Sequence, residues 1–113
     1  MEFRRKIFYY KSYFSDFYNK LDPKVKLKII WAIGLVRDLE RIPSKYFKHV
    51  EGTDGLYEIR VNVSNIIFRI FCFFDEGFLV IILHGFQKKS QKLPKNQIEK
   101  ALKLRKEYYD EKE

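Results

Sequence analysis

The sequence predicts an α+β domain in which a small, twisted, mostly antiparallel sheet packs against helices. An apolar stripe with helical spacing runs through residues 23–40, whereas residues 56–63 alternate apolar and polar side chains with the period of a strand. Strongly apolar runs follow at 66–74 and 78–87, and aromatic residues make up 18% of the chain, enough for a packed core. We therefore expect residues 1–113 to form a single domain with the element order β-α-α-β-β-β-α.

The first three elements are a short strand and two helices, which we expect to form a helical hairpin on one face of the sheet. Residues 3–10 show a weak alternation typical of a strand. Ser12 or Ser15 is expected to cap a short helix, and Asp22-Pro23 supplies an N-cap followed by proline at the first position of the second helix. The buried stripe of this second helix comprises Val25, Ile29, Ala32, Ile33, Val36 and Leu39.

The second helix is apolar over more of its circumference than one sheet face can cover. Its additional apolar side chains are Leu27, Ile30, Trp31 and Leu35. The simpler explanation is that the first helix packs back over them. The alternative is that a partner protein covers them.

Three strands and a last helix follow the glycine-rich turn at 52–55. Tight turns at 63–65 and 75–77 join the strands. Glu58 and Arg60 share the more polar face of the first of these strands, residues 56–63. Pro94 leads into a helix expected over 95–111, whose inward stripe comprises Ile98, Ala101, Leu102 and Arg105.

Arg69 interrupts the otherwise apolar strand 66–74. An arginine is almost never buried without a partner. One interpretation is an ion pair with Glu58 or another acid across neighbouring strands. The other is a guanidinium directed at a phosphate, which its planar fork can bind through two hydrogen bonds.

Charge and cysteine usage narrow the classes of function. The chain has 23 basic and 15 acidic residues, a net charge of +8, and the excess gathers in residues 88–106. Such a segment is expected to attract a polyanion, with nucleic acid as the leading candidate, although a solvated helix that keeps the protein soluble would look similar. The lone Cys72 fits a reducing compartment, and with no apparent secretion signal or membrane span we expect a cytoplasmic protein.

Residues 84–94, which follow the last apolar strand, read His-Gly-Phe-Gln-Lys-Lys-Ser-Gln-Lys-Leu-Pro. This segment resembles the His-x-Phe-x-Lys-Lys-x-x-x-x-Pro pattern of the phage-derived, HigB-like branch of the RelE/HigB toxin superfamily. The segment 55–61, the residues Phe68-Arg69-Ile70 and the order of elements are also similar. The resemblance implies a RelE-like fold and a toxin of a type II toxin–antitoxin module.

The resemblance further implies an endoribonuclease that cleaves mRNA on the ribosome, inhibits translation and is silenced by an antitoxin, usually a helix-turn-helix protein. The resemblance also places three lysines near RNA: Lys92, in the segment after the last strand, and Lys95 and Lys103 in the last helix. We further predict that an antitoxin segment partly covers the second apolar face of the second helix, around Leu27, Ile30, Trp31 and Leu35. The residues that the resemblance places around the scissile phosphate are Arg60, Arg69, His84, Lys88 and Lys89.

These residues suit a metal-free attack of a ribose 2′-hydroxyl on the adjacent phosphate. Arg60 and Arg69 would stabilise the phosphoryl charge, while His84 or a lysine of lowered pKa at Lys88 or Lys89 would act as acid or base. Glu58 is a second candidate base if it is not engaged in an ion pair. The sequence contains no metal-ligand spacing and no glycine-rich nucleotide loop, so we expect no metal and no cofactor.

Two other functions stay open at this point. The superfamily also contains ParE-like members, so the chain could inhibit gyrase without a catalytic site. It could also be a basic RNA-binding module without catalysis, in which lysines follow the RNA backbone and aromatic rings stack on bases.

Overall fold

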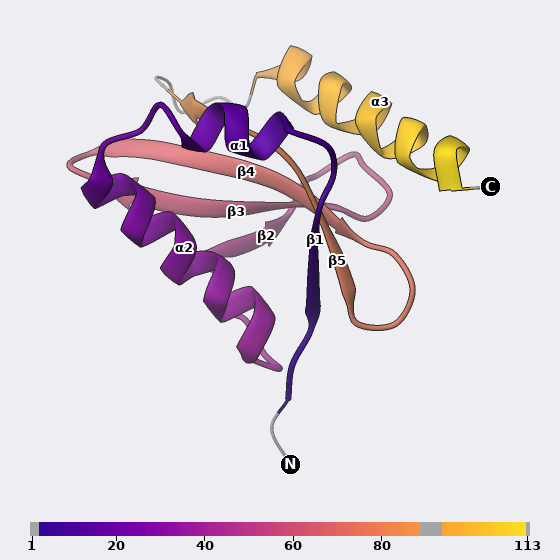
Figure 1. The fold of residues 1–113 in the computed structure, drawn as a ribbon, viewed down its shortest axis with the longest axis horizontal. Helices are drawn as coiled ribbons and strands as arrows, with labels where there is room; N and C mark the ends of the chain where they lie inside the picture. Colours follow the sequence, from indigo (N-terminus) through magenta and orange to yellow (C-terminus); the bar gives the residue numbers. More distant parts are fainter. Residues whose placement is uncertain (1–2, 89–93, 113) are drawn as a thin grey trace.

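In the computed structural model, residues 3–88 and 94–112 are described, and they form a five-stranded mixed sheet and three helices (Figure 1). The α+β class predicted from the sequence is confirmed. The elements, in chain order, are β1 (Lys6–Tyr9), α1 (Tyr13–Tyr18), α2 (Pro23–Asp38), β2 (Phe47–His49), β3 (Leu56–Val63), β4 (Ile66–Phe74), β5 (Leu79–Lys88) and α3 (Lys95–Lys112).

The strands lie side by side in the order β1-β5-β4-β3-β2. Neighbouring strands are antiparallel except for β1 and β5, which are parallel, with Lys6 opposite Leu79. Arg5 fixes the start of β1, because its guanidinium donates hydrogen bonds of 2.8 Å and 2.6 Å to the carbonyls of Val36 and Leu39 at the end of α2. The predicted mostly antiparallel sheet is therefore present, with a parallel strand at one edge.

The short strand β2 corrects the predicted order, which placed residues 47–49 in a loop. It pairs with β3, so that Phe47 lies opposite Ile59, and the Phe47 ring stacks on Tyr57 at a centroid distance of 4.9 Å. Three residues are too few to show the alternation that identifies a strand in a sequence. β2 exists because β3 offers it an open edge.

The β3–β4 hairpin has the tight connection that the sequence predicted. Ser64 and Asn65 both have positive φ, 51° and 65°, as a two-residue turn between twisted strands requires. The pairing continues from Leu56 opposite Phe73 to Val63 opposite Ile66. This register places Arg60 directly opposite Arg69, which matters for the site described below.

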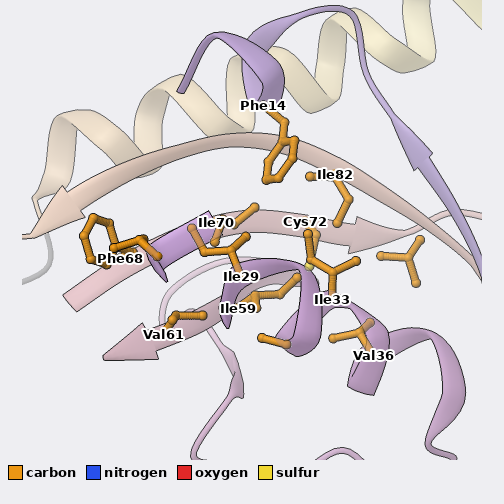
Figure 2. Packing of buried hydrophobic residues seen from close by; sticks show 13 residues of the cluster. Phe14, Ile29, Ile33, Val36, Ile59, Val61, Phe68, Ile70, Cys72 and Ile82 are labelled. Carbon is orange, nitrogen blue, oxygen red and sulfur yellow. The ribbon is translucent and has the colours of Figure 1, made fainter. Parts of the chain in front are cut away.

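α2 buries the predicted stripe against one face of the sheet (Figure 2). Ile29, Ala32 and Val36 are fully buried there, together with Phe14 of α1 and apolar residues of β3, β4 and β5. The helix ends at Asp38 rather than at residue 40. The prediction that Leu39 belongs to the buried stripe is wrong, because it follows the last helical turn and is 38% exposed.

α1 does not pack back over the outer side of α2, so that expectation is wrong. α1 instead lies against β5, and α2 crosses the sheet beside β3 (Figure 1). Leu27, Ile30 and Trp31 are 74%, 46% and 48% exposed, and Leu35 is partly buried. The outer side of α2 is thus an apolar surface open to solvent in the described part of the chain.

α3 covers the opposite face of the sheet. It buries Ala101 and Leu104, so the inward stripe is rotated relative to the predicted one, which included Arg105 instead of Leu104. Side chains also hold this helix to the strands: Tyr108 donates a 2.7 Å hydrogen bond to Asp75, and Tyr10 donates a 3.0 Å bond to Glu107. Within the described residues, no helix has the length and apolar character needed to cross a membrane.

Candidate functional site

The two arginines singled out from the sequence are neighbours in the sheet. Arg60 of β3 lies opposite Arg69 of β4, and Arg69 lies opposite Phe86 of β5. Residues paired in this way point to the same face. Arg60, Arg69 and Phe86 therefore form a row across three strands, on the face that α3 covers.

Glu58 lies between the two guanidinium groups. Its Oε1 accepts a 2.5 Å hydrogen bond from Nη1 of Arg69 and lies 3.7 Å from Nε of Arg60. The side chains of Glu58 and Arg69 are only 5% and 7% exposed, whereas that of Arg60 is 31% exposed. Of the two interpretations of Arg69, the structure contains the ion pair, and Arg60 is the guanidinium that a ligand can reach.

Arg60 opens into a pocket of about 360 Å³ at the free edge of β3. The backbone N–H of Arg60 donates to the Tyr46 carbonyl at 2.9 Å, and the N–H of Asn62, two residues further on, points to the same edge beyond the end of β2. The pocket brings together cations from α2, β3 and the connection that precedes β2. Its lining residues are Lys28, Lys45, Tyr46, Arg60, Val61, Asn62 and Ile67.

No carboxylate lines this pocket in the described part of the chain. Lys28, Lys45 and Arg60 thus create a positive potential around a pocket large enough for a phosphate and its ribose. Sequence analysis missed Lys28, Lys45 and Tyr46. Lys28 is one of several lysines on α2, and Lys45-Tyr46 lies in a connection without periodicity, so no sequence signal separated them from other basic residues.

A β-bulge decides the position of His84. Between the pairs Ile70–Gly85 and Cys72–Ile82, the single residue Phe71 of β4 faces two residues of β5. The extra residue turns His84 toward α3, where its Nε2 lies 2.9 Å from Oε1 of Gln97. Because that oxygen is an acceptor, Nε2 carries the proton.

His84 is 3% exposed, and burial lowers its pKa to about 4, with the positive charge of Lys100 acting in the same direction. The histidine is therefore neutral near pH 7. It lines a second pocket of about 350 Å³, formed with Tyr13 and Phe17 of α1 and with Lys100 of α3. The structure thus brings Arg60, Arg69 and Glu58 together, but places His84 in a different pocket.

The remaining predicted site residues lie around the end of β5 and along α3. Lys88 ends β5, with its backbone paired to Ile67. Its side chain, Lys89 and Lys92 lie outside the described residues. Lys95 and Lys103 are exposed on α3. Among the described residues, no group of three or more histidine, cysteine, aspartate or glutamate side chains could hold a metal ion.

A family of known proteins matches most of the chain. The family described as phage derived protein Gp49-like (DUF891) matches residues 16–106. The matched region runs from α1 into α3 and includes Arg60, Arg69 and His84, whereas β1 precedes it. No curated protein matches the chain.

Proposed function

Since the chain belongs to the Gp49-like family of phage-derived proteins, which is associated with toxin–antitoxin systems, we propose that it is a toxin that cleaves mRNA. The activity would be a metal-independent endoribonuclease of the RelE/HigB type, acting on the ribosome and arresting translation and growth. A cognate antitoxin, of the helix-turn-helix type in the HigB-like branch, would silence it.

The observation that carries this proposal is the cationic pocket at Arg60. Lys28, Lys45 and Arg60 converge there without a carboxylate among the described lining residues, an arrangement suited to binding a phosphodiester. Stabilising the charge that develops on phosphoryl oxygens is the largest contribution that fixed cations make to such a reaction. Arg60 would contact the scissile phosphate, and Lys28 and Lys45 would hold it or its neighbour.

The reaction would proceed by attack of the ribose 2′-oxygen on phosphorus. The new 2′-O–P bond forms as the bond from phosphorus to the 5′-oxygen breaks, leaving a cyclic phosphate and a 5′-hydroxyl. A base takes the 2′ proton, and an acid gives a proton to the 5′-oxygen. Lys88 and Lys89 remain the candidates for these two roles, because His84 lines a different pocket from Arg60.

Glu58 and Arg69 would act as positioning residues. Their ion pair is buried, so neither group is free to exchange a proton with substrate or to grip a phosphate. Glu58 instead lies within 3.7 Å of Arg60 and helps to orient its guanidinium at the mouth of the pocket. The candidate base Glu58 considered in the sequence analysis is thus engaged in an ion pair.

The antitoxin would bind the outer side of α2. Leu27, Ile30 and Trp31 are exposed along this helix, and the Trp31 ring meets Tyr46 edge to face at 5.0 Å. Tyr46 also lines the cationic pocket. An antitoxin segment on α2 would therefore reach the entrance of the pocket and could block it directly.

A non-catalytic RNA-binding module is the second candidate function. It is favoured by the position of His84, which lines a different pocket from Arg60, and by the burial of Arg69. Such a protein would bind RNA through the same cations without cutting it.

Inducible expression in a bacterial host, with primer extension on several messages, tests the proposal. Arg60→Ala is the informative variant, and Arg4→Ala, an exposed arginine paired with Asp38 on another part of the surface, is the matched control. Growth arrest with new mRNA cuts that Arg60→Ala abolishes and Arg4→Ala retains would support a nuclease. Arrest without cuts would favour the binding module or gyrase inhibition, and no arrest would contradict a toxin.

A further inference from the structure

Two hollows adjoin on the side of the sheet where β5 runs beyond its pairing with β1. The first, of about 350 Å³, lies between α1, β5 and α3 and is lined by His84; the second, of about 430 Å³, lies between the α1–α2 connection and the β3–β4 turn. They share Lys20, Leu21 and Gln87. We call these two adjoining hollows together the α1 tract, and their residues differ from those that line the Arg60 pocket.

Aromatic rings form the floor of the tract. Tyr13 and Phe17 lie one helical turn apart on α1, and both are partly buried. Phe17 lies very close to the strand because residue 85 is glycine: a Cβ there would lie 2.5 Å from Cε2 of Phe17. Ring faces held rigidly in this way can stack on a planar base.

Cations line the tract beside these rings. Nζ of Lys100 lies 5.8 Å from the centroid of the Tyr13 ring, Lys20 lies where the hollows meet, and Lys24 lines the second hollow. Asp16 and Asp22 also line the tract, so the lysines retain an excess of one charge and the carboxylates can accept hydrogen bonds from amino groups of bases. The combination suits a chain that alternates bases with phosphates.

His84 supplies an independent indication of a ligand. It is 3% exposed and lines the first hollow, and its Nδ1 has no hydrogen-bond partner among the described residues. A buried acceptor of this kind is costly unless a donor reaches it. The amino group of a nucleobase in the hollow is such a donor, provided that the imidazole rotates, because protein atoms cover Nδ1 in this structure.

We propose that the α1 tract binds two successive nucleotides of single-stranded RNA, with a base on Tyr13 and Phe17 and phosphates at Lys20 and Lys100. This rests on the proposed function, since it gives the RNA a second contact area besides the Arg60 pocket. Under this assignment His84 contacts a nucleobase and does not act as the acid or base of the cleavage reaction.

The test measures fluorescence anisotropy of a labelled, short 2′-O-methyl RNA, which cannot be cut by 2′-hydroxyl attack. The variant Lys20→Glu/Lys100→Glu should bind roughly tenfold more weakly and show a shallower dependence of affinity on salt. The control Lys6→Glu/Arg41→Glu makes the same change of charge at exposed positions away from the tract and should bind within about twofold of the parent chain. Equal losses in the two double variants would overturn the proposal.

Crosslinking locates the base. An oligonucleotide carrying 5-iodouridine should crosslink to Tyr13 or Phe17, as peptide mapping by mass spectrometry would reveal. Crosslinks at Tyr46 alone would place the strand in the Arg60 pocket and overturn the tract. If double-stranded DNA competes as well as the RNA, the binding is non-specific electrostatic attraction, and the proposal is also overturned.

The outcomes for the tract and for the nuclease are separable. Because the oligonucleotide cannot be cleaved, loss of binding in the tract variant supports the tract even if the chain proves to cut nothing. If the parent chain cuts mRNA but the tract variant binds RNA normally, the proposed RNA contact at the tract is refuted, whereas the proposed nuclease activity still stands.

Discussion

Under α1 and α2 the sheet buries aliphatic and aromatic side chains, whereas the face under α3 also buries Glu58, Arg69 and His84. The first face is a hydrophobic core of the ordinary kind. On the second, charged and polar groups are buried with incomplete hydrogen bonding in the described structure. The difference indicates that one face stabilises the fold while the other positions groups at the expense of stability.

Removal of Arg69 should give the largest effect. Arg69→Ala leaves the Glu58 carboxylate buried without its partner, so we expect the free energy of unfolding to fall by about 3–5 kcal/mol. Arg60→Ala, at a side chain that is 31% exposed, should cost less than about 1 kcal/mol. Urea denaturation monitored by circular dichroism provides both values.

A double substitution sharpens this result. Glu58→Leu/Arg69→Met removes both charges and should recover most of the stability that Arg69→Ala loses. If the double variant is as unstable as Arg69→Ala, the two side chains stabilise the fold through packing and not through the pairing of their charges.

The hydrophobic face should respond through lost volume. Ile29 is fully buried, so Ile29→Ala should lower the free energy of unfolding by about 2–5 kcal/mol. Leu27→Ala, two residues away on the outer side of α2 and 74% exposed, should change it by less than about 0.5 kcal/mol. Similar losses at both positions in thermal or urea unfolding would mean that the outer side is covered in solution.

The close approach of α1 to β5 can be tested with glycine. Gly85→Ala forces its Cβ against Phe17 and should destabilise the protein by about 1–3 kcal/mol. Gly34→Ala, within α2, meets nothing closer than Arg37 at 3.7 Å and should stabilise it by about 0.5–1 kcal/mol. In denaturation experiments the two substitutions should change the free energy of unfolding in opposite directions. If both substitutions raise it, the Phe17 side chain moves freely.

The smallest effect is a dependence of stability on pH. The pKa of His84 is lowered to about 4 when folded, against about 6.5 when unfolded, so only the unfolded chain takes up a proton between these values. Stability from this residue is complete above pH 6.5 and falls as the pH drops toward 4, by at most about 2 kcal/mol between pH 7 and pH 5.

His84→Gln is the variant that isolates this contribution. Urea denaturation at both pH values should show a smaller loss of stability in the variant than in the parent chain. An equal loss would assign the effect to other groups.

Much of the fold was predictable because it depends on local pattern. The stripe through Ile29 and Ala32 identified α2, and the alternation around Ile59 identified β3. The partner of α1 was not predictable, since amphipathicity shows which side of a helix is buried but not against which element. The bulge at His84 also depends on the pairing of two strands and leaves no mark in either strand alone.

The candidate site was predictable only in part, for the same physical reason. Arg69 stood out as a charge within an apolar strand, and one of its two interpretations was an ion pair with Glu58 or another acid, which the structure contains. Lys28 and Lys45 were missed because they are separated in sequence and meet only at the open edge of β3. A pocket at a sheet edge is a product of tertiary structure.

The parallel pairing of β1 with β5 has a consequence for synthesis of the protein. β1 emerges from the ribosome before its partner strand, which is made about seventy residues later, so this edge of the sheet can close only after β5 has been made. Contacts between such distant segments slow folding. Until β1 docks on it, the apolar strand β5 presents an unpaired edge to other chains, and such an edge favours aggregation.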